Sequence, residues 1–206
     1  IMRSLRSRGA TVILVPPTST FDDVMRHQPD GVVLTNGPGD PARLAPQVAV
    51  ARELMARLPM LGICLGHQVI GRAAGAETSR LPFGHHGGNH PVKHLATGRV
   101  AITSQNHEFQ VVAETLVEGS GFRVSERNLN DGSVEGLAHA SLPVFSVQYH
   151  PEGAPGPHDN QRVFDDFAEM VGRTQHKLVL TARPDRPDLA EPRTRPKKVL
   201  VIGSGP

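Results

Sequence analysis

The stretch Pro59-Met-Leu-Gly-Ile-Cys64-Leu-Gly-His-Gln-Val-Ile70 decides the fold of this 206-residue chain and holds its only cysteine. The apolar run 60–63 predicts a short buried strand, and the residues after the cysteine predict a helix. The spacing Gly62-x-Cys64-x-Gly66 is typical of a nucleophile elbow, a sharp strand-to-helix turn that exposes a reactive side chain. The glycines allow close backbone approach, and a helix N-terminus favours a thiolate. A buried structural cysteine is the alternative interpretation of Cys64.

The composition predicts one globular domain with additional segments and an aliphatic core, since aromatic residues make up only 4% of the chain. No apolar stretch reaches the roughly 20 residues that span a bilayer, so we expect no membrane association. One cysteine cannot form an internal disulfide, which fits a cytoplasmic protein. Residues 181–198 carry six Lys/Arg against three Asp/Glu, which accounts for the net charge of +2. The remainder is close to neutral, so no nucleic-acid partner is expected.

Strand and helix patterns alternate from the start of the chain to Ala74. Thr20 is a predicted helix N-cap with acidic residues in the first turn. This alternation predicts an α/β fold, an open and mostly parallel sheet with helices on both faces. Beyond Ala76 we expect short strands separated by Gly- and His-rich loops, and then a last helix that ends at Gly172. The expected strands are 11–15, 31–35, 60–63, 100–103, 110–112, 134–138 and 144–148, and the main expected helices are 44–55 and 65–74.

The pattern divides the chain into three units. Residues 1–173 form the main α/β domain, and residues 174–196 form a linker in which prolines alternate with charges. Residues 197–206 predict a strand followed by a Gly-Ser-Gly turn, which we interpret as the start of a second, truncated domain. A strand that leads into Gly-x-Gly often opens a nucleotide-binding unit, but this short stretch is weak evidence by itself.

Three chemically useful elements follow predicted strands: Cys64, the pair His150 and Glu152, and the turn that contains Gly37 and Gly39. In open parallel sheets, sites gather beyond the carboxyl ends of the strands, so we expect these elements to converge. An imidazole that removes the thiol proton and a carboxylate that orients the imidazole would complete a nucleophilic site. Taken singly, the histidine and the glutamate would be interpreted as ordinary surface residues, and the glycines as a tight turn.

An attacked amide develops an oxyanion that needs donors fixed in advance. The backbone N–H of Leu65 is the expected first donor, and Gly37 or Gly39 supplies the second. Gln68 is expected to point into the site from the following helix, and the run 105–109 can contact substrate.

Four histidines, His85, His86, His90 and His94, lie close together in the sequence. Their spacing does not match a helical zinc pair, and no cysteine or carboxylate joins them. We therefore expect a glycine-rich binding or interface loop here and no metal site.

With these residues the chain closely resembles the class I glutamine amidotransferases, and among them the small component of carbamoyl-phosphate synthetase. The resemblance covers roughly residues 1–173. It is carried by the segments 36–41, 62–68, 83–92, 105–107, 150–152 and 155–159. The segment 197–206 resembles the opening of the large, ATP-using synthetase component.

The resemblance implies that glutamine is hydrolysed at Cys64 through a glutamyl thioester, with His150 as acid and base and Glu152 orienting it. The ammonia passes to the large component, which makes carbamoyl phosphate from bicarbonate for pyrimidine and arginine biosynthesis. ATP and magnesium serve that component, and no cofactor is expected in this domain. The positions that match glutamine contacts are Gly37, Gly39, Leu65, Gln68, Asn106, Glu108 and Phe109.

The chain departs from the family pattern in two respects. Glu108 stands where the family favours glycine, and it would be strained if the position required a positive φ. The family's earlier strand, and an N-terminal domain that contributes a serine to glutamine binding, are also missing. A missing inner strand would expose ladder groups, so we expect the isolated fragment to fold poorly.

Three alternatives remain open from the sequence. The domain can belong to an amidotransferase of another biosynthetic pathway, since the product depends on the separate domain that accepts the ammonia. It can be a cysteine peptidase or hydrolase built on a similar elbow. It can also be a non-catalytic amidotransferase-like scaffold that only binds a partner.

Overall fold

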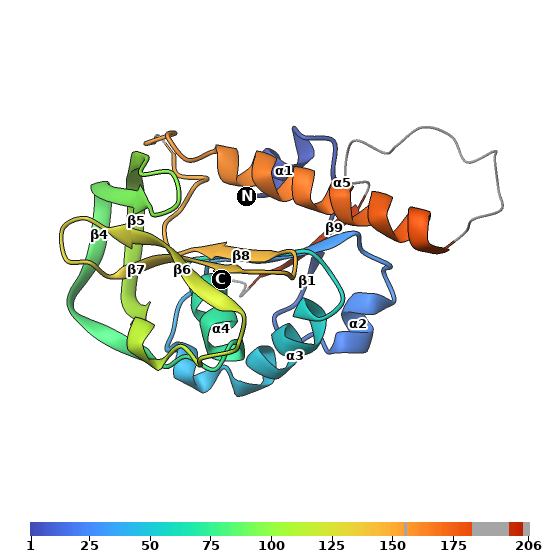
Figure 1. Ribbon diagram of the computed structural model, residues 1–206, viewed down its shortest axis with the longest axis horizontal. Helices are drawn as coiled ribbons and strands as arrows, with labels where there is room; N and C mark the ends of the chain where they lie inside the picture. The colour runs from blue at the N-terminus through green and yellow to red at the C-terminus, as the bar shows by residue number, and fades with distance from the viewer. Residues whose placement is uncertain (155, 183–197, 204–206) are drawn as a thin grey trace.

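The computed structural model describes residues 1–154, 156–182 and 198–203 (Figure 1). The described strands form one nine-stranded mixed sheet in the order β1-β9-β2-β3-β8-β7-β6-β4-β5. The strands are β1 (Thr11–Val15), β2 (Gly31–Leu34), β3 (Met60–Ile63), β4 (Thr78–His94), β5 (Val100–Val111), β6 (Phe122–Asn128), β7 (Val134–His139), β8 (Val144–Val147) and β9 (Lys198–Ile202). The α-helices are α1 (Met2–Arg6), α2 (Phe21–Met25), α3 (Ala45–Met55), α4 (Leu65–Ala73) and α5 (Arg162–Ala182), and the short 3₁₀ turns are η1 (Pro41–Arg43) and η2 (Ala113–Thr115).

The sheet has a parallel half and an antiparallel half. Strands β1, β9, β2, β3 and β8 pair in parallel, whereas β7, β6, β4 and β5 pair antiparallel. Helices α1 and α5 cover one face of the parallel half, and α2, α3 and α4 cover the other (Figure 1). The predicted α/β sheet with helices on both faces is therefore confirmed, and its second half is more antiparallel than the sequence indicates.

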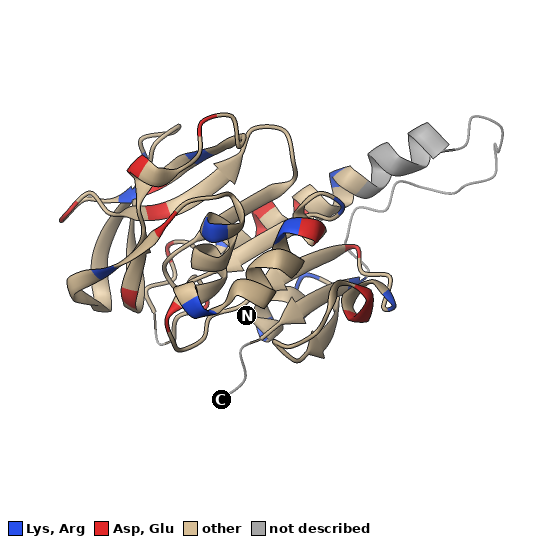
Figure 2. Ribbon diagram, turned by 90° about the horizontal axis from the view of Figure 1, so that it is seen from below, with Lys and Arg blue, Asp and Glu red and all other residues tan. Residues whose placement is uncertain are grey.

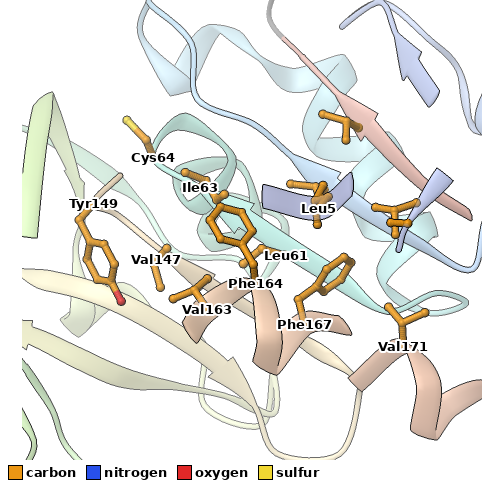
Figure 3. Packing of buried hydrophobic residues seen from close by; sticks show 14 of the residues in the cluster. Leu5, Leu61, Ile63, Cys64, Val147, Tyr149, Val163, Phe164, Phe167 and Val171 are labelled. Atoms are coloured by element: carbon orange, nitrogen blue, oxygen red, sulfur yellow. The ribbon is translucent and has the colours of Figure 1, made fainter. Parts of the chain in front are cut away.

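Two apolar clusters, one on each face, hold the parallel half together. On the α1 and α5 face, Leu5, Phe164 and Phe167 pack on Leu61 and Ile63 of β3, and Cys64 lies at one end of this cluster (Figure 3). On the other face, residues of α2, α3 and α4 pack on the alternate positions of the same strands. Because both faces are covered, β2 and β3 are buried along their whole length, which explains why they appear as unbroken apolar runs.

The local signals of the parallel half are confirmed. Thr20 caps α2 in a capping box, in which its hydroxyl accepts from the Asp23 N–H and the Asp23 carboxylate accepts from the Thr20 N–H. The helix that follows the cysteine strand begins at Leu65, directly after the predicted elbow.

Two expectations beyond Ala76 are wrong, and one strand was not predicted. The Gly- and His-rich segment is part of the long strand β4 rather than a loop, and the two short strands expected at 100–103 and 110–112 are one continuous strand, β5. Strand β6 was not expected. These strands bury polar side chains, so they lack the apolar alternation by which a strand is recognised.

Helix α5 runs to Ala182, past the expected end at Gly172 and into the expected linker. Residues 183–196 of that linker lie outside the described residues. The division of the chain at 173 and 196 stays a prediction.

The strand expected near Lys197 is confirmed as β9, and it lies inside the main sheet. It pairs in parallel with β1 on one side and β2 on the other, with Leu200 opposite Ile13 and Val32. The ladder groups that were expected to be exposed by a missing inner strand are therefore covered by β9. Whether β9 also begins a second domain stays a prediction.

Among the described residues, no helix has the length and apolar character needed to cross a membrane. Acidic and basic residues are interspersed along the described ribbon (Figure 2).

Candidate active site

The backbone at Cys64 is strained in the way that a nucleophile elbow requires. The residue lies between β3 and α4 with φ 56° and ψ −107°, and its side chain is buried. Such a conformation is rare for a residue with a side chain and persists only when the surroundings enforce it. Close packing around the two glycines supplies this enforcement: a Cβ on Gly66 would lie 2.1 Å from the Leu34 carbonyl oxygen, and one on Gly62 would lie 2.6 Å from that of Gly66.

Backbone hydrogen bonds bring Cys64 and His150 to the same place. The Cys64 N–H donates to the carbonyl oxygen of Val147, the last residue of β8, at 2.9 Å. Three residues further along, the His150 N–H donates to the Ser104 carbonyl oxygen on β5, also at 2.9 Å. The end of β8 therefore lies between α4 and β5.

The side chains of His150 and Glu152 form the expected pair. The imidazole Nδ1 lies 3.0 Å from a Glu152 carboxylate oxygen, and both side chains are mostly buried. Burial lowers the pKa of His150, but the hydrogen bonds and charges of Cys64 and Glu152 outweigh it and raise the pKa to about 10. The other nitrogen, Nε2, is buried without a hydrogen bond of good geometry, although the thiol is near enough to affect the pKa. This arrangement favours a protonated His150 imidazole beside the Cys64 sulfur.

A cavity of 410 Å³ opens beside Cys64. It is bounded by the turn after β2, by α4, and by β4 and β5. The residues that line it are Gly37, Pro38, Gly39, Asp40, Cys64, Gln68, His86, Asn106, His107, Glu108 and Phe109. Six of the seven predicted substrate-contacting residues are in this lining, and the seventh, Leu65, directly follows Cys64. His150 and Glu152 are not part of the lining; His150 lies near the thiol, and Glu152 contacts His150.

Gln68 and Asn106 connect the cavity walls. The Gln68 amide nitrogen donates to the Phe109 carbonyl oxygen at 2.9 Å and to the Gln148 side-chain oxygen at 3.0 Å. The Asn106 carbonyl oxygen lies 4.0 Å from the Cys64 sulfur. These contacts fix α4 against β5 and place the start of the helix at the cavity.

Glu108 is accommodated without backbone strain. Among the described residues, only Gln28 and Cys64 have a positive φ without being glycine. Glu108 lies within β5, and its carboxylate pairs with the Arg80 guanidinium of β4 at 2.6 Å, with both side chains more than half exposed. The glutamate therefore adds a charged group to the rim of the cavity.

Three residues of the cavity, Pro38, Asp40 and His86, were not predicted from the sequence. Pro38 and Asp40 lie in the recognised glycine turn, and the Asp40 carboxylate caps η1 by accepting from the Ala42 N–H. His86 faces the Asn106 side-chain oxygen at 3.0 Å. Only the pairing register of β4 with β5 reveals this contact, since His86 lies opposite Asn106.

Two buried histidines near the site are held neutral. Burial, with a smaller effect from His107, lowers the pKa of His67 to about 3, and its Nδ1 lies 2.9 Å from the Ser146 hydroxyl. Burial also lowers the pKa of His107 to about 4, against the opposing charge of Glu135. Neither ring carries a charge near neutral pH.

A family model described as glutamine amidotransferase class-I matches residues 1–170 of the chain. The most similar curated proteins include the carbamoyl phosphate synthase small chains of three bacteria. The Akkermansia muciniphila protein is 51% identical over 177 residues, which cover 86% of this chain and 47% of that protein. The Symbiobacterium thermophilum protein is 51% identical, with 84% of this chain and 48% of that protein covered. The Aquifex aeolicus protein is 49% identical, with 83% of this chain and 46% of that protein covered. The chain spans about half the length of these relatives.

Among solved structures, the chain resembles a protein of Thermoplasma acidophilum that has been assigned to GMP synthase. The TM-score is 0.72 at 20% identity, with 86% of this chain and 89% of that chain covered. At this identity the match supports the fold alone.

Proposed function

The chain belongs to the class I glutamine amidotransferase family, and from this premise we propose that it hydrolyses the side-chain amide of glutamine with Cys64, His150 and Glu152. One arrangement carries the proposal. Cys64, whose backbone is strained, lies beside the His150–Glu152 pair. Its side chain lines a cavity large enough for an amino acid. Lone buried cysteines seldom have such partners, which argues against a structural thiol or a passive scaffold.

The proposed reaction begins with attack of the Cys64 thiolate on the amide carbon. The carbonyl oxygen gains negative charge, and the N–H groups of Leu65 and of Gly37 or Gly39 are the donors that we assign to it. His150 then gives its proton to the departing nitrogen, the C–N bond breaks, and ammonia leaves behind a glutamyl thioester. Water attacks the thioester, His150 takes a proton from this water, and glutamate and the thiolate are released.

Glu152 holds the imidazole in the orientation that these proton transfers need and stabilises its charged form. Gln68, Asn106, Glu108 and Phe109 are the remaining residues that we assign to glutamine binding. In this scheme the domain itself needs no cofactor.

We further propose that the ammonia serves carbamoyl phosphate synthesis by a large, ATP- and magnesium-dependent partner in the cytoplasm. The similarity to carbamoyl phosphate synthase small chains supports this acceptor over other amidotransferase products. Pyrimidine and arginine biosynthesis are the pathways that such a product would supply.

The decisive assay measures glutamate release from L-glutamine by the full protein with its synthetase partner. We expect Cys64→Ala to lower kcat/KM by a factor of about 10⁴ or more, while carbamoyl phosphate is still made from free ammonia. Glutamate release that survives in this variant would refute the assigned nucleophile. Cleavage of peptides without glutaminase activity would instead support the hydrolase alternative.

A further inference from the structure

A second polar cluster lies beneath the cavity, in the antiparallel half of the sheet. His85 of β4, His107 of β5 and Glu135 of β7 are all buried, and their ligand-type atoms lie within 4.8 Å of one another. The strands that carry them are separated along the chain, so the sequence alone does not reveal the group. We propose that these three side chains bind one divalent transition-metal ion of the zinc type.

The outer nitrogen of each histidine already has an oxygen partner. His85 Nε2 lies 2.8 Å from an Asp131 carboxylate oxygen, and His107 Nδ1 lies 2.7 Å from the Phe109 carbonyl oxygen. When these nitrogens donate, the inner nitrogens, His85 Nδ1 and His107 Nε2, carry lone pairs. Metal-binding histidines are oriented in this way by a carboxylate or carbonyl behind the ring.

The spacing of the inner atoms fits coordination better than hydrogen bonding. His85 Nδ1 lies 3.4 Å from a Glu135 oxygen and is buried without a hydrogen bond. A charge-assisted hydrogen bond would be about 2.7–2.9 Å long. Two ligands on a tetrahedral zinc ion, each about 2.0–2.2 Å from it, lie about 3.3–3.5 Å apart.

The cluster also holds more acceptors than its own donors satisfy. His107 Nε2 faces the Gln105 side-chain oxygen at 2.9 Å, yet a neutral imidazole that donates from Nδ1 has no second proton to offer. In the orientation described, the Gln105 amide nitrogen donates to the Glu135 carboxylate at 2.8 Å. Exchanging the amide oxygen and nitrogen would satisfy His107 but would place the Gln105 oxygen against that carboxylate, so an unsatisfied contact would remain. A cation among these groups removes the conflict in either orientation.

The chemistry of the donors selects the class of ion. Two imidazoles and one carboxylate suit zinc and its neighbours, whereas magnesium and calcium prefer oxygen ligands throughout. Asp131, whose side chain is 42% exposed, connects the cluster to solvent and marks a route of entry. Bound there, the ion would link β4, β5 and β7 beneath Asn106 and Glu108, so its role is to position the cavity wall.

The test uses the full protein with the Cys64→Ala substitution, which removes the thiolate as a competing zinc ligand. After treatment with a chelator, zinc is titrated, bound zinc is counted by elemental analysis, and cobalt is added as a spectroscopic substitute. We expect one zinc per chain and visible cobalt bands typical of nitrogen and oxygen ligands in low coordination. His85→Asn and Glu135→Gln should weaken zinc binding by about 100-fold, and Asp131→Asn by about 10–100-fold.

His158→Asn, which changes an exposed histidine outside the cluster, is the matched control and should bind zinc normally. If Glu135→Gln does not fold, as judged by circular dichroism, the half-exposed Asp131→Asn variant decides the result. Absence of stoichiometric zinc in the Cys64→Ala protein would overturn the proposal, and so would affinity unchanged by both His85→Asn and Asp131→Asn.

Discussion

The parallel and antiparallel halves of this sheet are stabilised by different interactions. In the parallel half, β2 and β3 lie between two apolar layers, and the helix that follows the nucleophile is packed so closely that only glycine fits at Gly66. In the antiparallel half, a smaller apolar cluster that includes Val111, Val134 and Leu137 lies beside buried polar side chains of β4, β5 and β7. Those with less than a tenth of their surface exposed include His85, Thr103, Gln105, His107, Asn128 and Glu135.

The difference shows how the site is divided between the halves. Close apolar packing enforces the strained backbone of Cys64, whereas a hydrogen-bonded network supports β5, the strand that carries several cavity-lining residues. A buried polar network is stable only when nearly every group has a partner. The first half should therefore be most sensitive to added volume, and the second to the loss of a single partner.

The largest expected effect is that of Gly66→Ala in the parallel half. The new Cβ would meet the Leu34 carbonyl oxygen at 2.1 Å, so the start of α4 must move away from β2. We expect a loss of about 5 kcal/mol or more in the free energy of unfolding, measured with denaturant. Gly98→Ala, which meets nothing within 4 Å but has a φ of +70°, is the control and should lose only about 1–2 kcal/mol. Equal losses would show that the packing at the elbow is looser than described.

Glu135→Ala should have the next largest effect, in the antiparallel half. The substitution leaves the Gln105 and Asn128 side-chain amides without their buried acceptor, which should cost about 3–5 kcal/mol. Glu108→Ala breaks an exposed ion pair with Arg80 and should cost less than about 1 kcal/mol. If the two substitutions cost the same, the buried network is not a stabilising feature of this half.

Leu200→Ala tests whether β9 belongs to the parallel half. Leu200 is fully buried between its neighbours on β1 and β2, so the substitution should lower the free energy of unfolding by about 2–4 kcal/mol. Leu95, which is 45% exposed, provides the matched control, and Leu95→Ala should change stability by no more than about 0.5 kcal/mol. If the Leu200→Ala protein were as stable as the parent, the placement of β9 between β1 and β2 would be wrong.

The last expected effect is a pH dependence that arises from His67 at the junction of the two halves. Its pKa in the folded protein is about 3, below the ordinary 6.5, so the folded state resists protonation. Stability from this group is complete above pH 6.5 and declines as the pH falls toward 3, by at most about 1.4 kcal/mol per pH unit. Unfolding measured between pH 7 and pH 4 in the parent and in His67→Asn checks this. A slope that the substitution leaves unchanged would mean that His67 titrates normally.

The sequence predicts the parallel half well because both of its signals are local. Unbroken apolar runs mark the strands β2 and β3, and a helical pattern marks α4. The Gly-x-Cys-x-Gly spacing marks the elbow between β3 and α4. The strand nature of Lys198–Ile202 is local too, but its place between β1 and β2 depends on pairing that no short stretch encodes.

The antiparallel half is predicted poorly because the usual alternation of buried apolar and exposed polar side chains is reversed along its strands. Along β5, Ile102 is exposed, whereas Gln105 and His107 are buried, so a search for apolar alternation breaks this strand into pieces. The expectation that no carboxylate joins the histidine cluster also rested on sequence neighbours. Glu135 reaches His85 only because the sheet brings β7 toward β4 and β5. Most cavity residues were found because they lie in short motifs. Pro38 and Asp40 were missed although they lie in the recognised glycine turn, and His86 is placed only by the strand pairing.

The most direct test of the central claim is to trap the acyl-enzyme at Cys64. The full protein is mixed with glutamine, quenched in acid during turnover and digested, and the peptide that contains Cys64 is examined by mass spectrometry. The account predicts a glutamyl thioester on Cys64 in the parent, more of it in Glu152→Gln if deacylation slows, and none in Cys64→Ala. Undiminished glutamate release by the Cys64→Ala protein, with no acyl group on the parent cysteine, would contradict it.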